Sequence, residues 1–89
     1  MHSPTRLAIL GALRQVQQIN FADLQASLEL STAELSRQLG ILEKEELVDI
    51  AKFREQRRAV TRVRLSPAGR ERFDEYLGEL RKVVRAEIE

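Results

Sequence analysis

The chain has 89 residues, of which 43% are hydrophobic and 33% are charged, and this length accommodates one small domain. Opposite charges almost balance, at a formal net charge of +1, so the composition does not indicate disorder. The absence of cysteine excludes disulfides, thiolate metal sites and cysteine nucleophiles. No apolar run approaches the roughly 20 residues of a membrane span and no signal-peptide core follows Met1, so we expect a cytoplasmic protein without membrane contact.

The charges are unevenly distributed along the chain. Six basic residues stand between Lys52 and Arg64 against the single acid Glu55, which gives this segment a net charge of +5, whereas the rest of the chain carries −4. A basic segment on a mildly acidic chain favours contact with a polyanion through one element. A solvated surface explains such a run equally well, so the surrounding elements have to decide between the two.

The first predicted helix covers residues 3–16. Ser3-Pro4 is a typical opening, with serine as the N-cap and proline at the first helical position. Its apolar residues recur at helical spacing over more than one face, so this helix needs several neighbours or a second subunit to cover it. These residues are Leu7, Ile9, Leu10, Leu13 and Val16.

Two further helices are predicted to form a helix-turn-helix over residues 20–45. Asn20 can cap a short helix over 21–28, and Ser31 with Glu34 forms a capping box for a third helix that begins at Thr32. Only Glu29-Leu30 separates the two helices, so we expect them to cross steeply. The third helix turns a stripe of leucines inward, namely Leu35, Leu39 and Leu42.

Residues 47–66 are predicted to form a hairpin with a basic tip. Leu47–Phe53 is rich in β-formers, with Val48 and Ile50 on one side, and apolar residues alternate with arginines in 61–65. Residues 54–59 contain no glycine or proline, which predicts a loose, mobile loop. A last helix over 67–89 opens at Ser66-Pro67 and carries apolar residues at coiled-coil-like spacing, namely Phe73, Leu77, Leu80, Val84 and Ile88.

This order of elements is that of a winged helix-turn-helix, and nearly the whole sequence resembles the small winged-helix transcriptional regulators of the MarR/ArsR-like group. The resemblance rests on SPTRLAIL at 3–10, LSRQL at 35–39, Leu42-Glu43, Leu47-Val48 and LSPAGR at 65–70, which is similar to the family motif L-[ST]-x-x-G-R. It implies a mainly α (α+β) domain over residues 1–89, with three helices, a two- or three-stranded wing and a long C-terminal helix. The family commonly has glycine where Glu46 stands, so we expect the turn after the third helix to be made differently. Many members have histidine where Gln38 stands, which alters one possible groove contact but not the fold.

In such a fold the N-terminal part of the third helix reads base edges in the major groove, and the wing meets phosphates or the minor groove. Arg37 can grip guanine or a phosphate, or form an ion pair within the chain. Glu34 is a poor neighbour for DNA unless the capping box holds it back or it accepts a hydrogen bond from cytosine. The predicted DNA-binding residues are Ser31, Thr32, Ala33, Ser36, Arg37, Gln38, Arg54, Arg57, Arg58, Arg62 and Arg64.

Two of these predictions have ordinary alternatives. Ser31 is a helix cap first, and Arg62 and Arg64 can instead pair with acids such as Asp49 across the hairpin. The DNA hypothesis also requires that residues 32–38 and the ribbon 57–64 point the same way, so that one duplex touches both.

The surplus apolar surface of the first and last helices favours a twofold dimer. Its predicted interface residues, which can also be core, are Leu7, Leu10, Phe73, Leu77, Leu80, Val84 and Ile88. A dimer would place two recognition helices about one DNA turn (~34 Å) apart over a pseudo-palindromic operator. We therefore expect a homodimeric regulator that binds double-stranded DNA, most simply a repressor that occludes a promoter. The alternative is a winged-helix module whose basic hairpin binds an acidic protein.

An enzyme is not expected. The single histidine, His2, stands at the chain end, and a single histidine cannot complete a zinc site. Glu43, Glu45 and Glu46 are more typical of a solvated surface than of a metal cluster. The sequence indicates no metal or other cofactor. A small-molecule effector is possible but not indicated, because only the cleft between the dimer helices and the DNA-binding lobes offers it space.

Overall fold

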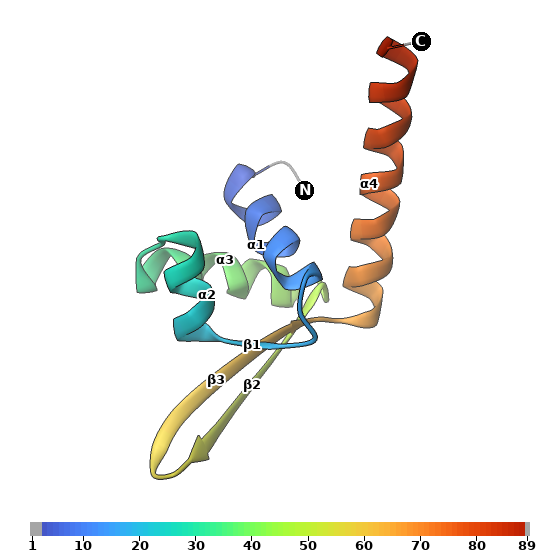
Figure 1. Ribbon diagram of the computed structural model, residues 1–89. Helices are drawn as coiled ribbons and strands as arrows, with labels where there is room; N and C mark the ends of the chain where they lie inside the picture. Colours follow the sequence, from blue (N-terminus) through green and yellow to red (C-terminus); the bar gives the residue numbers. More distant parts are fainter. Residues whose placement is uncertain (1–2, 89) are drawn as a thin grey trace.

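The computed structural model describes residues 3–88, with side chains through residue 87, and combines four helices with a three-stranded antiparallel sheet (Figure 1). The strand order is β1-β3-β2. This arrangement confirms the predicted mainly α (α+β) winged helix-turn-helix. No helix in the described part of the chain is long and apolar enough to cross a membrane. The elements are α1 (Pro4–Arg14), β1 (Ile19–Asn20), α2 (Phe21–Leu28), α3 (Thr32–Lys44), β2 (Val48–Glu55), β3 (Arg58–Leu65) and α4 (Pro67–Ile88).

The helix starts follow the capping residues, with one exception. The hydroxyl oxygen of Ser3 accepts a hydrogen bond from the Arg6 amide at 3.4 Å, and that of Ser31 accepts one from the Glu34 amide at 3.0 Å. Asn20 occupies the N-cap position of α2 without capping it. Its side-chain oxygen accepts a hydrogen bond from Arg62 Nε at 3.2 Å instead. The predicted Asn20 cap is therefore wrong, because a charged donor from β3 takes its acceptor.

Two glutamates end α2 and α3 in the left-handed backbone region. Glu29 has a φ of 54° and Glu46 a φ of 62°. Around Glu46 the amides of Glu46 and Leu47 donate to the carbonyls of Glu43 and Leu42, at 2.9 and 3.0 Å, which is the Schellman pattern. The expectation of a different turn at this point is wrong for the backbone: Glu46 adopts the conformation that favours glycine, at a cost of about 1–2 kcal/mol.

The wing is a tight hairpin. The strands pair as far as Glu55 and Arg58, and the two residues between them, Gln56 and Arg57, have φ values of 49° and 67°. Two consecutive residues with positive φ form a type I′ turn, whose twist matches that of the flanking strands. The predicted loose loop over 54–59 is therefore wrong, because strand pairing continues to the tip and imposes this turn even without glycine or asparagine. β1 adds a third strand through the pairs Ile19↔Val63 and Asn20↔Arg62.

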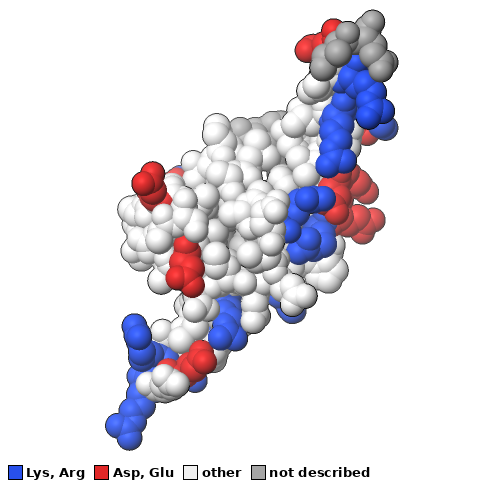
Figure 2. Space-filling view, viewed as in Figure 1, with Lys and Arg blue, Asp and Glu red and all other residues white. Residues whose placement is uncertain are grey.

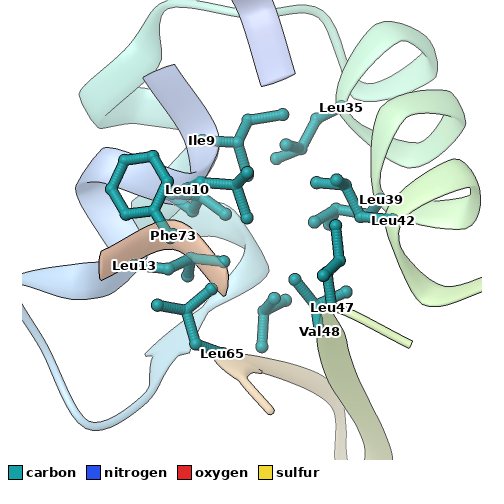
Figure 3. Packing of buried hydrophobic residues seen from close by; sticks show 12 residues of the cluster. Ile9, Leu10, Leu13, Leu35, Leu39, Leu42, Leu47, Val48, Leu65 and Phe73 are labelled. Atoms are coloured by element: carbon teal, nitrogen blue, oxygen red, sulfur yellow. The ribbon is translucent and has the colours of Figure 1, made fainter. Parts of the chain in front are cut away.

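The core lies where α1, α2 and α3 meet the base of the sheet and the first turns of α4 (Figure 3). Leu10 and Phe73, which we predicted at a dimer interface, are 1% and 5% exposed and belong to this core within a single chain. Leu7 and Leu77 are half-buried and pack against its edge. The remaining members are Ile9, Leu13, Leu24, Leu35, Leu39, Leu42, Leu47, Val48, Val63 and Leu65.

The segment LSPAGR fastens α4 to the rest of the fold. The hydroxyl of Ser66 donates to the Glu46 carbonyl at 2.7 Å and accepts from the Gly69 amide at 2.8 Å. The backbone of Gly69 lies so close to the Leu47 carbonyl that a Cβ would overlap it. The guanidinium of Arg70 donates to the carbonyl of Arg14, the last residue of α1, and to that of Val16 just beyond it. One short motif therefore sets the position of α4 against α1 and against the turn that joins α3 to the wing.

Candidate nucleic-acid interface

The first turns of α3 present a row of small polar side chains. Ser31, Thr32, Ala33 and Ser36 are exposed, while Leu35, Leu39 and Leu42 are buried. The hydroxyl oxygen of Thr32 accepts a hydrogen bond from Gln25 of α2 at 3.0 Å. This hydrogen bond ties α2 to the N-terminal end of α3. Short side chains at a helix N-terminus, with its free amides, allow the backbone to come close to a duplex.

Gln38 does not lie on this outer face. It is 5% exposed, its Nε2 donates to Glu34 Oε1 at 2.9 Å, and its Oε1 is buried without a hydrogen-bond partner among the described residues. Gln38 follows Leu35 by three positions and precedes Leu42 by four, so it belongs to the inward stripe of the helix. The prediction that Gln38 faces the DNA groove is therefore wrong.

Arg37 is exposed but already paired in the free chain. Its Nε and Nη2 donate to the two carboxylate oxygens of Glu34 at 3.2 and 3.0 Å. These hydrogen bonds, and the one from Gln38, hold the pKa of Glu34 below its ordinary value. The Glu34 carboxylate thus turns to Arg37 and Gln38, while the Ser31 half of the capping box forms. The Arg37 side chain is 61% exposed, so this ion pair contributes little to stability and its guanidinium can exchange partners.

The arginines at the base of the wing lie on the sheet face away from α3. Arg64 pairs with Asp49 at 3.3 Å, which is the alternative that the sequence left open. Arg62 pairs with Glu55 at 3.3 Å and stacks over the ring of Phe53, 4.8 Å from its centre. Because side chains alternate along a strand, both arginines point opposite to the buried Val63. The expectation that the whole ribbon 57–64 faces the same way as α3 is wrong for these two residues, and the same alternation puts Arg58, which pairs with Glu55 across the strands, on that face as well.

Four cations of the wing form no ion pair with the acids of the described residues. Arg54 donates to the Arg57 carbonyl at 3.2 Å and so braces the turn. Within residues 3–88, no ion pair joins Lys52, Arg54, Arg57 or Arg58 to a carboxylate. Figure 2 shows basic side chains gathered at the far end of the hairpin, below a body that is mostly uncharged on this face. The tip is therefore the part of the wing best able to attract phosphates.

An open groove of about 620 Å³ connects α3 with the wing. Ser36 and Glu43 of α3 stand on one side of it, and Lys52 and Thr61 of the paired strands stand on the other. The first residue of α2, Phe21, also lines it, together with Leu39, Gly40 and Ile50. Lys52 and Thr61 are not among the site residues predicted from the sequence. The sequence contains a pattern that predicts the position of Lys52, because the alternation that puts Val48 and Ile50 on one face of the strand continues to Lys52.

Two residues named in the sequence predictions cannot be compared with the structure. His2 and the side chain of Ile88 lie outside the described part of the chain. Among the described residues, no group of three or more histidines and acids is placed to hold a metal ion. Glu43, Glu45 and Glu46 are all exposed.

The sequence matches a known protein family. The family model described as "Winged helix DNA-binding domain" matches residues 5–84. The chain belongs to this winged-helix DNA-binding family. No protein in the curated collection matches the sequence.

Solved structures show the same fold. A transcriptional regulator homologue from Pyrococcus horikoshii is 27% identical, with a TM-score of 0.89 over 94% of this chain and 83% of that one. NadR in complex with 4-hydroxyphenylacetate is 21% identical, with a TM-score of 0.77 over 94% of this chain and 59% of NadR. A mutant of MarR from E. coli complexed with operator DNA is 22% identical, with a TM-score of 0.66 over 75% of this chain and 47% of MarR. This chain thus spans about half to three fifths of NadR and MarR.

Proposed function

We propose that this winged-helix chain is a transcriptional regulator that binds double-stranded DNA sequence-specifically as a homodimer. The observation that carries the proposal is the groove between α3 and the wing, because it joins the exposed face of α3 to Lys52 and lies between that face and the unpaired cations of the tip. A surface of this shape accepts a duplex along both elements. The structurally similar MarR mutant was solved in complex with operator DNA, which supports DNA binding by a chain of this fold.

The two elements divide the work of recognition. Thr32, Ala33, Ser36 and Arg37 face the major groove, where base edges carry the sequence information. The hydroxyl of Ser31 and the helix amides suit a phosphate. The wing residues contact phosphates or the minor groove, which fixes the register but reads little sequence. They are Lys52, Arg54, Arg57 and Arg58.

The dimer in this proposal forms through α4. This helix of 22 residues is about 33 Å long. It packs on the body through Phe73 and Leu77, and it continues past the other elements in Figure 1, away from the wing. Beyond that contact, Leu80, Val83 and Val84 are 46%, 56% and 50% exposed. A twofold partner would cover them and present two α3 helices to a pseudo-palindromic operator, where the bound dimer represses transcription by occluding the promoter.

The function is tested by titrating the chain against genomic fragments and random duplex at two salt concentrations. We expect a Kd of about 10⁻⁸ M for selected fragments and a steep loss of affinity as salt increases. Salt-insensitive binding, or no binding to any fragment, would contradict the proposal and favour a module whose basic wing binds an acidic protein.

The dimer is tested by sedimentation of Val84→Glu beside a control, Lys82→Glu. Val84 lies on the exposed apolar side of α4, whereas the exposed Lys82 lies on the opposite side of the helix. We expect the wild-type chain and the control to sediment as dimers and Val84→Glu to sediment as a monomer. A monomeric wild-type chain would refute the dimer and leave DNA binding to be judged by the titration.

A further inference from the structure

The carboxylate of Glu34 is held from two sides by donors of different mobility. Its Oε1 accepts from Arg37 Nη2 at 3.0 Å and from Gln38 Nε2 at 2.9 Å, and its Oε2 accepts from Arg37 Nε at 3.2 Å. The Arg37 side chain is 61% exposed, whereas Gln38 is 5% exposed. Arg37 can therefore swing away to another partner while Gln38 stays in place.

Gln38 has a reason to keep its hold on Glu34. Its Oε1 is buried without a partner in the described part of the chain, so its only side-chain hydrogen bond recorded there is the one to Glu34. Losing that bond would leave both ends of a buried amide unpaired, which proteins strongly avoid. The carboxylate therefore keeps its position on α3 whether or not Arg37 remains beside it.

A fixed carboxylate beside Arg37 changes what α3 can bind. When the guanidinium turns toward a duplex, Glu34 is left with an oxygen free of protein donors and a negative charge close to the DNA. A phosphate repels that charge. In the major groove, the N4 amino group of cytosine donates to such a carboxylate, and the O6 and N7 of guanine accept from an arginine. Glu34 and Arg37 are three positions apart on one helix face, so neighbouring bases can serve both.

We propose that Glu34 is a specificity-determining residue of α3, held by Gln38 as its positioning residue. The pair Glu34 and Arg37 favours sites that offer guanine to Arg37 and cytosine to Glu34, and it weakens binding to other duplex sequences. The Glu34 charge also disfavours contacts between Arg37 and phosphates. This inference rests on the proposed function, because it assigns a role within the same DNA-binding face.

The experiment compares Glu34→Gln with Glu43→Gln, which removes the same charge from another residue of α3, about two and a half turns further along the helix, that lines the groove. Binding is measured to a selected genomic site, to that site with its G·C pairs replaced singly by A·T, and to random duplex. We expect Glu34→Gln to bind random duplex at least about threefold more tightly than Glu43→Gln does. We also expect its ratio of selected-site to random affinity to fall about tenfold, with the preference for one G·C pair lost. Equal effects of the two variants, or an unchanged base preference, would overturn the inference.

Gln38→Met tests the positioning role, because methionine fills a similar volume and removes the amide. We expect the variant to fold, to lose part of the same G·C preference and to raise the pKa of Glu34 in a carboxyl NMR titration. A folded Gln38→Met with wild-type base preference would remove Gln38 from the proposal. A wild-type chain that prefers no fragment overturns the proposed function and this inference with it. A sequence-specific wild-type chain whose Glu34→Gln variant keeps the same base preference overturns the inference alone.

Discussion

The outer face of α3 and the tip of the wing hold their cations in opposite ways. Arg37 on α3 is paired with a neighbouring acid, whereas Arg57 and Arg58 at the tip have no acid partner within residues 3–88. A free cation attracts any phosphate, but a paired one gains only from a partner that replaces its acid. Under the proposed function, general affinity for DNA therefore resides in the wing and selectivity resides in α3.

The largest effect is expected from Gly69→Ala, which disturbs the packing of α4 on the turn between α3 and the wing. A Cβ at this position would overlap the Leu47 carbonyl, at the turn that joins α3 to β2. Because backbone rather than a flexible side chain must move, we expect a loss of about 3 kcal/mol in the free energy of unfolding and a marked loss of DNA binding. Thermal melting and anisotropy titrations measure both.

The matched control for Gly69→Ala is Gly11→Ala in α1, where a Cβ meets nothing within 4 Å. Alanine is the better helix former, so this variant is expected to gain about 0.5–1 kcal/mol. If Gly69→Ala melts and binds like the wild-type chain, the junction does not fix α3 against the wing.

The next largest effect is expected from replacing Arg57 and Arg58 with alanine, which tests the wing alone. If the tip contacts phosphates, affinity falls about tenfold or more for selected and random duplex alike. The slope of log K against log salt decreases by about two, because two counterion-releasing contacts are removed. The double lysine variant keeps both charges and should stay close to wild type. A loss confined to the selected site would instead place base reading at the tip.

A more selective effect is expected for Arg37→Ala. The ratio of selected-site to random affinity should fall about tenfold. Binding to random duplex should fall by less, because there Arg37 is paired with Glu34 and its removal only uncovers the Glu34 charge. Arg81→Ala on α4 removes the same charge far from the groove and serves as control. An equal loss on both duplexes would assign Arg37 to phosphates and remove the contrast between α3 and the wing.

Local patterns in the sequence predicted most of the fold. The serine caps, the leucine stripe of α3 and the alternation in β2 each depend on neighbours within a few residues. The tight turn at the tip of the wing was not predicted, because glutamine and arginine, the residues at 56 and 57, rarely adopt positive φ. The pairing of two long strands imposes that turn, and strand pairing is not a local property.

The candidate site was harder to predict than the fold. The outward position of Thr32, Ala33, Ser36 and Arg37 followed from the leucine stripe. Gln38 was misplaced because a polar side chain was taken as outward although its position belongs to that stripe. For the arginines at the base of the wing, the sequence offered Asp49 as an alternative partner, and Arg64 pairs with it. The partners of Arg62 were not named, because Asn20 lies 42 positions away along the chain and meets it only through the pairing of β1 with β3.

The smallest effect concerns the protonation of Glu34. Hydrogen bonds from Arg37 and Gln38 lower the pKa of this carboxyl, so the ionised form stabilises the folded chain above the ordinary pKa, and this contribution is lost as the pH falls through the lowered folded value. In a carboxyl NMR titration, Arg37→Ala should move the pKa of Glu34 upward toward its ordinary value, but not fully, because Gln38 still donates. An unchanged pKa would mean that Arg37 does not hold the carboxylate in solution, and the difference between a paired α3 and an unpaired wing tip would disappear with it.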